Sequence, residues 1–291
     1  MDVPGYLAFI EVARHGSFSK AAEALFITQP AVSKRVAQLE QQLNCQLFDR
    51  IGRKALLNEA GSALLPIAQR IVQDIQESQR IIDNLSGEIA GKLPLVTSHH
   101  IGLRRLPNIL KSFTRKYPKV RLDLAFMDSE NACHELEQGH YELGIVTLPL
   151  TPLKNLKLTP LWDDPLAIAV VTDHPLSKQK NITLEELAKY PAILPSTGTY
   201  TRTVIEAAIM SRQKKLEVIL ETNYLETIRT MVSTGIGWSA LPKTMIDADL
   251  LEIPIPNLHM QRTLGVVQHT NRSLSNASKA FLKALQAPPS P

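Results

Sequence analysis

Cysteine is scarce in this sequence, because its 291 residues include only 2, Cys45 and Cys133. Two thiols that lie far apart, in unrelated sequence contexts, do not make a disulfide framework and instead favour a reducing compartment. A redox-sensing pair is an alternative interpretation. Neither cysteine has the basic flank that would favour a thiolate, so the sequence does not support that alternative.

Long apolar runs are also absent. No stretch approaches the roughly 20 apolar residues that a membrane-spanning helix requires. The N-terminal segment contains Asp2 and Glu11 and has no cationic start followed by an apolar stretch, so it does not resemble a signal peptide. We therefore expect a cytoplasmic protein without membrane contact. The formal net charge is only +4, which is compatible with a nucleic-acid partner but does not by itself indicate one.

The sequence also lacks the signatures of common enzyme sites. It contains no G-x-S-x-G elbow, P-loop, G-x-G-x-x-G or H-E-x-x-H motif. Ser98 precedes His99, which suggests a hydrolase, but adjacent residues on a strand-to-helix turn rarely face each other. The pair His99 and His100 is not joined by another ligand at metal-binding spacing. We therefore expect no enzymatic activity, no cofactor and no metal.

The first part of the chain has the apolar periodicity of packed helices. The inward stripe of a first helix repeats at i, i+3, i+4 and i+7, in the residues Tyr6, Phe9, Ile10 and Ala13. Gly16 is expected to end this helix, and Ser19 to cap a second one over Lys20–Leu25. Thr28 is a good N-cap for a third helix, with Pro30 in its first turn, where a missing N–H does no harm.

The third helix is expected to have two different faces. Its apolar face packs on the first two helices and consists of Val32, Val36, Leu39 and Leu43. Its other face is small, polar and weakly basic, and consists of Pro30, Ser33, Lys34, Ala37 and Gln38. Such a helix fits the major groove of B-DNA, where Gln29, Ser33 and Lys34 offer hydrogen-bond donors. The alternative is that this face is merely solvated.

A short basic hairpin follows the third helix. The segment from Phe48 to Leu57 predicts two strands whose tip carries Arg50, Arg53 and Lys54. Arginines at the tip of a two-stranded wing can reach an adjacent minor groove and its phosphates. Helix, turn, proline-started helix and basic hairpin in this order favour a winged helix-turn-helix over a solvated surface.

The same region resembles the N-terminal signature of LysR-type transcription regulators. The matching residues are Gly16-Ser17-Phe18, Ala21-Ala22, Leu25, Thr28 to Ser33, Leu39-Glu40, Leu47-Phe48, Arg50, Arg53 and Ala60-Gly61. The DNA-binding residues expected from the pattern and the resemblance are Thr28, Gln29, Pro30, Ser33, Lys34, Arg50 and Arg53. Asn58 stands where the family usually has Thr, and Asn caps a helix equally well.

A long uninterrupted helix is expected from Glu59 onward. A heptad seam runs along it through Leu64, Ala68, Ile71, Ile75, Ser78, Ile82 and Leu85. Pro66 is expected to kink or disturb the first turns. So narrow a stripe favours pairing with a second copy, and the alternative is packing against the chain's own C-terminal part. The resemblance likewise implies a homodimer through this linker helix and assembly into a homotetramer.

The remainder alternates apolar strands with helical segments, as an α/β domain does. The strands expected first are Leu93–Thr97, Leu122–Phe126, Leu143–Thr147 and Leu166–Val171. The helices expected are Ile101–Lys116, Asn131–Gln138 and Tyr200–Gln213, and later elements are Glu217–Leu220, Tyr224–Ser233 and Gly237–Leu241. This part resembles the LysR sensor, which is similar to a two-lobed periplasmic binding protein with two crossing strands.

Ligands of open α/β sheets bind outside the carboxyl ends of strands, beside helix N-termini. This rule selects hydroxyl, amide and imidazole groups that suit a small anion such as a carboxylate. The effector-binding residues expected are Ser98, His99, His100, Thr147, Ser196, Thr197, Thr199 and Asn223. Ordinary helix capping is the alternative for each hydroxyl. The double histidine is not a feature expected of the family.

The sequence thus predicts a multidomain protein with an N-terminal all-α winged helix-turn-helix, a long linker helix and a C-terminal α/β domain of two lobes. The expected bounds are 1–60, 61–90 and 91–291, with one lobe at 91–162 and 266–291 and the other at 163–265. Expected partners are double-stranded DNA, a small-molecule effector, further copies of the chain and RNA polymerase. A free solute-binding protein would leave the first ninety residues unexplained, and an architectural DNA binder would leave the cleft unused.

Overall fold

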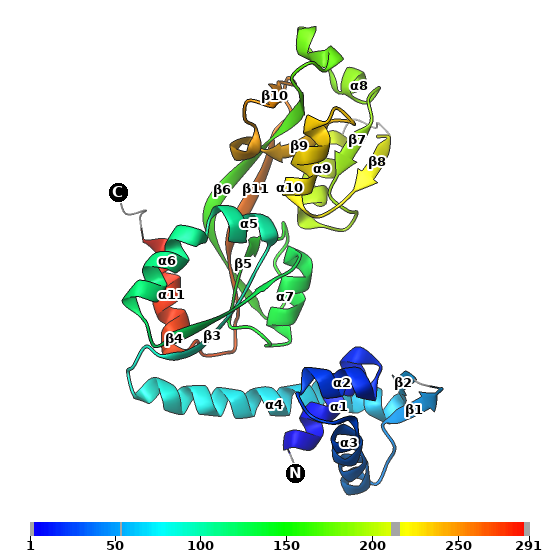
Figure 1. Cartoon of the computed structure of the whole chain (residues 1–291), viewed down its shortest axis with the longest axis vertical. Coiled ribbons are helices and arrows are strands. Elements are labelled where there is room, and N and C mark those ends of the chain that lie inside the picture. The colour runs from blue at the N-terminus through cyan, green and yellow to red at the C-terminus, as the bar shows by residue number, and fades with distance from the viewer. Residues whose placement is uncertain (1–2, 53, 211–215, 288–291) are drawn as a thin grey trace. The chain divides into compact units, whose positions relative to one another are not determined.

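The computed structural model describes residues 3–52, 54–210 and 216–287 (Figure 1). The chain forms two compact units, Met1–Ser86 and Gly87–Pro291. The elements of the first unit are α1 (Val3–His15), α2 (Phe18–Ala24), α3 (Gln29–Leu43), β1 (Phe48–Ile51), β2 (Lys54–Leu57) and α4 (Glu59–Leu85). This unit is the expected winged helix-turn-helix followed by a long helix.

The helix ends of the first unit differ from the sequence prediction in two places. Ser17, and not Ser19, caps α2, and its side chain accepts a hydrogen bond from the N–H of Lys20. Gly16 has a φ of 60°, which turns the chain directly after α1 and brings Ser17 into the cap position. Leu43 was expected to be buried but is 37% exposed, because it lies in the last turn of α3, directly before the left-handed Asn44 that ends the helix.

Helix α4 is continuous through Pro66. Asn58 caps it as expected, since its side chain accepts a hydrogen bond from the N–H of Gly61 at 2.9 Å. Gly61 is required here, because a Cβ at this position would lie 2.1 Å from the carbonyl oxygen of Leu47. The start of α4 is thereby held against the chain that enters the hairpin.

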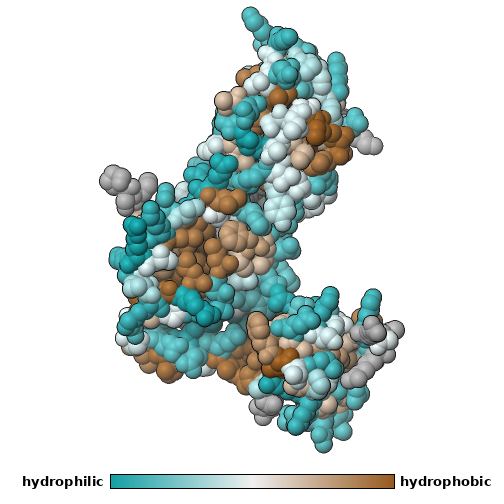
Figure 2. Space-filling model, in the orientation of Figure 1, coloured by the Kyte–Doolittle hydropathy of each residue, from teal (hydrophilic) through white to brown (hydrophobic). Residues whose placement is uncertain are grey.

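The apolar seam of α4 is buried only in part. Ala68 and Val72 belong to the core of the first unit. Further along, Ile75, Ile82 and Leu85 are 43%, 62% and 78% exposed, and Figure 2 shows apolar side chains near the C-terminal end of this helix. The second half of α4 therefore presents an uncovered apolar face.

The second unit is built on a mixed sheet of seven strands in the order β10-β6-β11-β5-β3-β4, with β9 paired to β6. Its strands are β3 (Gly91–Thr97), β4 (Val120–Phe126), β5 (Leu143–Thr147), β6 (Leu156–Val171), β9 (Ser239–Pro242), β10 (Leu250–Ile253) and β11 (Met260–His269). A small parallel sheet contains β7 (Ala192–Leu194) and β8 (Val218–Glu221). The helices are α5 (His99–Arg104), α6 (Pro107–Lys116), α7 (Ser129–Glu137), α8 (Leu184–Leu187), α9 (Tyr200–Met210), α10 (Leu225–Ser233) and α11 (Asn276–Gln286).

This unit has two lobes that share the long strands β6 and β11 (Figure 1). Lobe one contains β3, β4, β5, α5, α6, α7 and α11, and lobe two contains β7 to β10 and α8 to α10. The core of lobe one joins Leu93, Leu143 and Phe113 with Leu264 and Phe281 from the end of the chain. The core of lobe two surrounds the fully buried Trp238. Each shared strand therefore contributes to both cores.

Two expected elements of this unit were wrong in extent. The helix expected over Ile101–Lys116 is divided into α5 and α6, because Pro107 has no N–H to continue the helical hydrogen-bond ladder. The strand expected over Leu166–Val171 is only the end of the 16-residue β6. Pro160 and Pro165 lie inside that strand, and proline argues against a strand interior. Helix α9 ends at Met210, and the rest of its expected range, 211–213, lies outside the described residues.

Candidate functional site

The outer face of α3 carries the polar residues selected from the sequence. Thr28, Gln29, Pro30 and Lys34 are exposed and Ser33 is half-buried. The side-chain amide of Gln29 donates to the hydroxyl of Ser33 at 2.9 Å. This hydrogen bond orders the two side chains on the same face, while the amide oxygen and second N–H of Gln29 remain available for contacts from outside.

The hairpin that follows is the expected one. Strands β1 and β2 pair in register from Phe48 opposite Leu57 to Ile51 opposite Lys54. Gly52, with a φ of 61°, begins the two-residue connection. Arg50 lies on β1 and Lys54 on β2, whereas Arg53 lies outside the described residues.

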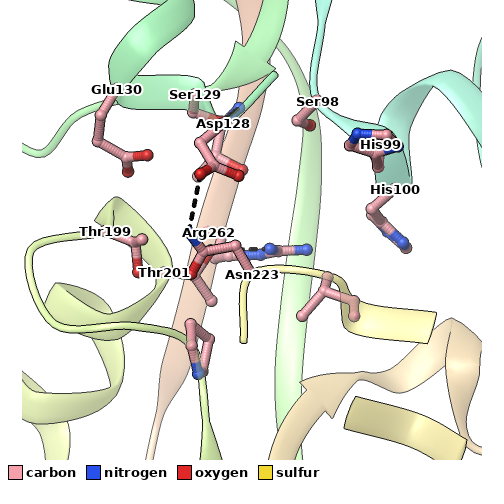
Figure 3. Close-up of a pocket in the computed structure, with 13 residues that line it drawn as sticks. Ser98, His99, His100, Asp128, Ser129, Glu130, Thr199, Thr201, Asn223 and Arg262 are labelled. Carbon is pink, nitrogen blue, oxygen red and sulfur yellow. Dashed lines mark hydrogen bonds between the residues drawn. The ribbon is translucent and has the colours of Figure 1, made fainter. Parts of the chain in front are cut away.

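A pocket opens between the two lobes of the second unit (Figure 3). Lobe one and the shared strands contribute Ser98, His99, His100, Asp128, Ser129, Glu130, Thr147 and Arg262, and lobe two contributes Pro195, Thr199, Thr201, Asn223 and Leu225. Helices α7, α9 and α10 all begin at this pocket, so backbone N–H groups and positive helix ends face it. The arrangement can bind a small polar molecule by hydrogen bonds from several directions.

Most of the expected effector residues lie together in this pocket, namely Ser98, His99, His100, Thr147, Thr199 and Asn223. Ser196 and Thr197 do not line it. The N–H of Ser196 donates to the side chain of Asn223 at 3.0 Å, and the hydroxyl of Thr197 donates to Glu221 at 3.5 Å. The backbone of Ser196 therefore orients Asn223, which itself faces the pocket.

Sequence reasoning missed part of the lining, namely Asp128, Ser129, Glu130, Pro195, Thr201, Leu225 and Arg262. Asp128 and Ser129 follow the end of β4, as the N-cap and the first residue of α7, so the rule that selected Ser98 would also have selected them. Arg262 lies inside β11 and carries no local signal of this kind. Only its pairing with Asp164 on β6 places it at the pocket.

Arg262 and Asp164 form a buried ion pair, with exposures of only 3% and 1%. The guanidinium donates from Nε to Oδ2 of Asp164 at 3.1 Å, donates again from Nη2 to the same oxygen, and donates from Nη1 to the hydroxyl of Thr201 at 2.9 Å. Burial lowers the pKa of Arg262, and Asp164 opposes that shift. An arginine stays protonated in proteins, so the pocket contains a fixed cation that links the shared strands to α9.

The two histidines have different surroundings. The His99 ring packs against Phe126 and Tyr224, with ring centroids 5.3 and 4.7 Å away. His100 is 6% exposed, and its Nδ1 lies 3.7 Å from Oε1 of Glu226, too far for a hydrogen bond. Interaction with His100, helped by the charge of Arg104, lowers the pKa of the Glu226 carboxyl.

Two carboxylates at the start of α7 reach across the pocket. Oδ2 of Asp128 accepts a hydrogen bond from the amide of Asn223 at 2.8 Å (Figure 3). Glu130 accepts one from the backbone N–H of Tyr200, the first residue of α9. Burial, with a smaller contribution from the charge of Asp128, raises the pKa of Glu130. These contacts join lobe one to lobe two.

The two thiols are expected to differ strongly in reactivity. Cys45 is exposed, whereas Cys133 is buried in α7, and burial raises the pKa of the Cys133 thiol to about 11. At pH 8 only about one thousandth of Cys133 is then thiolate. A disulfide reagent should label Cys45 rapidly in the native protein, and Cys45→Ser should remove this fast phase of the labelling. Equally fast labelling of Cys133 would contradict the assigned burial.

Neither a metal centre nor a membrane span is found in the described part of the chain. Within residues 3–52, 54–210 and 216–287, no three His, Cys, Asp or Glu side chains gather as a metal ion would require. The helices of those ranges also lack the combined length and apolar character needed to cross a bilayer.

Comparison with known proteins gives matches to both units. Residues 6–62 match the family model of the bacterial regulatory helix-turn-helix protein, lysR family, and residues 86–288 match the LysR substrate binding domain. A protein of Synechocystis sp. PCC 6803 described as "Probable RuBisCO transcriptional regulator" is 34% identical over 282 residues, which cover 94% of this chain and 82% of that one.

Solved structures show the same architecture. Full-length CbnR, solved in complex with its target DNA, has a TM-score of 0.64 at 19% identity and covers 98% of this chain and 99% of its own. At that identity the likeness concerns the fold alone. The regulatory domain of Synechocystis PCC6803 CcmR in complex with 2-PG has a TM-score of 0.61 at 26% identity and covers 67% of this chain and 96% of its own.

Proposed function

This chain belongs to the LysR family of transcription regulators, and from that premise we propose that a small anion bound between its two lobes switches its activity on DNA. The observation that carries the proposal is the pocket lining. Ser98 and Thr147 line a space at which α7, α9 and α10 begin. Thr199 lines it as well, although its hydroxyl already donates to the carbonyl of Ser196 and accepts from the N–H of Arg202. The buried guanidinium of Arg262, which is paired with Asp164, adds charged N–H donors.

The chemistry of the lining favours a carboxylate-bearing or similarly compact anion. Backbone N–H groups, hydroxyls and a guanidinium all donate hydrogen bonds, and charge-assisted hydrogen bonds to an anion are the stronger kind. The 2-PG bound by the CcmR regulatory domain makes that compound a rational first probe for this pocket. His99 and His100 are proposed to contact the effector beside Ser98.

We assign the DNA contacts to the first unit. In this assignment Gln29, Ser33 and Lys34 on α3 meet bases and their flanking phosphates in the major groove, with Thr28 and Pro30 at the start of that helix. Arg50 and Arg53 of the hairpin contact the minor groove and its phosphates. Residues 1–60 would form the DNA-binding domain, 61–90 the linker and 91–291 the sensor, with its lobes at 91–162 with 266–291 and at 163–265.

Pairing is assigned to α4, whose uncovered Ile75, Ile82 and Leu85 support a homodimer through the seam. A homotetramer would place several DNA-binding units on one regulatory region. The effector would alter lobe closure or tetramer shape, and thereby DNA bending and contact with RNA polymerase in the cytoplasm. It can do so only through different affinities for the two conformations. We propose that the protein has no enzymatic activity.

Selection of fragmented genomic DNA on the purified protein tests the DNA-binding proposal. At about 0.15 M salt, where weak phosphate contacts are screened, sequencing of the retained fragments should show a few sites with two-fold symmetric half-sites. Retention of bulk DNA without enriched sites would leave a non-specific binder and contradict the proposal.

Two substitutions then separate base contacts from phosphate contacts on a selected site. Ser33→Ala should change sequence preference, because it removes a group assigned to base edges. Arg50→Ala should weaken binding about equally on all sequences and reduce the salt slope by about 1. Fluorescence anisotropy on matched and mismatched duplexes measures both effects. If Ser33→Ala lost the same affinity on all sequences, the base contact assigned to Ser33 would be contradicted.

A further inference from the structure

The start of α7 holds the two lobes together on one side of the pocket. Asp128 and Glu130, both at the start of this lobe-one helix, accept hydrogen bonds from the Asn223 side chain and the Tyr200 N–H of lobe two. One turn further along α7, the thiol of Cys133 and the hydroxyl of Tyr200 lie near enough to raise or lower each other's pKa. The ring of Tyr200 packs against the lobe-one core that contains Cys133 and Leu136.

The position of the Glu130 carboxylate is the position that an anionic ligand would favour. The N–H of Tyr200 is the first of α9, and unpaired N–H groups at a helix start bind anions. The N–H of Arg202, two residues further on, already donates a hydrogen bond to the hydroxyl of Thr199 at 3.2 Å. Glu130, which lines the pocket, therefore occupies the first N–H donor of α9.

We infer that Glu130 acts as a resident carboxylate that latches the two lobes at the start of α9, and that the effector anion must displace it to bind. The inference rests on the proposed function and identifies a specificity-determining residue of the same pocket. Burial raises the pKa of Glu130, so its ionised form is less stable at this place than in water. A ligand anion bears the same desolvation cost, and it replaces Glu130 through contacts that Glu130 lacks, such as those to the N–H groups of Arg262.

The same pocket offers further partners to such a ligand. His100 lines it and is 6% exposed. Its Nδ1 lies 3.7 Å from the Glu226 carboxylate and has no hydrogen-bond partner among the described residues. Arg262 has N–H groups beyond those that Asp164 and Thr201 accept. A compact anion that displaces Glu130 thus exchanges one contact for several.

The latch can be measured without any ligand, because Tyr200 packs against the core that contains Cys133. In a Cys45→Ser background, Glu130→Ala should increase the labelling rate of Cys133 by at least about tenfold over Glu130→Gln. The glutamine variant removes the same charge, which also acts on the thiol, but keeps an oxygen that accepts from Tyr200. Asn131→Ala, an exposed neighbour on α7, should leave the rate unchanged. Equal rates in the alanine and glutamine variants would overturn the latch.

Displacement is measured by calorimetric titration of the full-length protein and its variants with 2-PG. Glu130→Ala should bind at least about tenfold more tightly than the unsubstituted protein, with Asn131→Ala unchanged. Weaker binding by Glu130→Ala would overturn the inference, because Glu130 would then contact the ligand directly. If no variant binds 2-PG and the Cys133 rates still differ, the latch is supported and the proposed effector chemistry fails, so the two failures are distinguishable.

Discussion

Replacing Arg262 with methionine is expected to lower the free energy of unfolding of the C-terminal unit by about 3–5 kcal/mol. The substitution leaves Asp164, which is 1% exposed, as a buried carboxylate without its partner. Oδ1 of Asp164 has no hydrogen bond among the described residues, and the next cation, Arg105, lies 3.7 Å from it. Urea denaturation followed by tryptophan fluorescence measures the loss, since Trp162 and Trp238 are the only 2 tryptophans and both lie in this unit.

Two variants provide the controls for this prediction. Lys243→Met breaks an ion pair of the same unit whose side chains are 51% and 41% exposed, and it should cost at most about 1 kcal/mol. Arg262→Met combined with Asp164→Leu should recover most of the loss, because replacing a whole buried pair by apolar groups is often close to neutral. A loss in Arg262→Met no larger than that of Lys243→Met would show that Asp164 does not depend on this guanidinium.

Ile82→Glu is expected to convert the protein to a monomer and to lower its affinity for a site with two half-sites by at least about a hundredfold. Ile82 is 62% exposed on the seam of α4, and a carboxylate there would be removed from water into the apolar seam of a paired helix. Linking two binding units raises overall affinity by roughly 10²–10⁴-fold, so loss of pairing removes that gain. Sedimentation and DNA titration at the same protein concentration measure both effects.

A charge added off the seam is the matched control. Gln76 is exposed on α4 and follows the seam residue Ile75, so its side chain points about 100° away around the helix. Gln76→Glu should leave both the oligomeric state and the DNA affinity unchanged. A dimer that persists in Ile82→Glu would place the pairing surface elsewhere on the chain.

The first unit could be predicted well from sequence because its signals are local. The apolar stripe of α1, the proline in the first turn of α3 and the Asn58 cap each act within one or two turns of their own helix. The errors were also local: Ser17 and Ser19 are equally good capping residues by type. Only the conformation of Gly16 decides between them.

The second unit was less predictable because its decisive contacts join distant segments. Short buried strands such as Leu143–Thr147 were found from their apolar runs, whereas no element was predicted after Pro242. The first part of strand β6 was not predicted, because it contains Pro160 and Pro165. Strand β11 forms through its pairing with β5 and β6. No sequence pattern marks Arg262 or Glu130. Their roles depend on Asp164 and Tyr200 respectively, and each partner is distant in the sequence.

The return of β11 and α11 to lobe one has a consequence for synthesis on the ribosome. The core of lobe one is incomplete until Leu264, Val266 and Phe281 have been translated, whereas most of lobe two's core is present once Ile255 has emerged. Domains usually fold in the order in which they are made. Here strand β5 of lobe one stays unpaired on one edge while lobe two is translated. Lobe one, which is translated first, is completed last, when β11 pairs with β5 and α11 packs on its core.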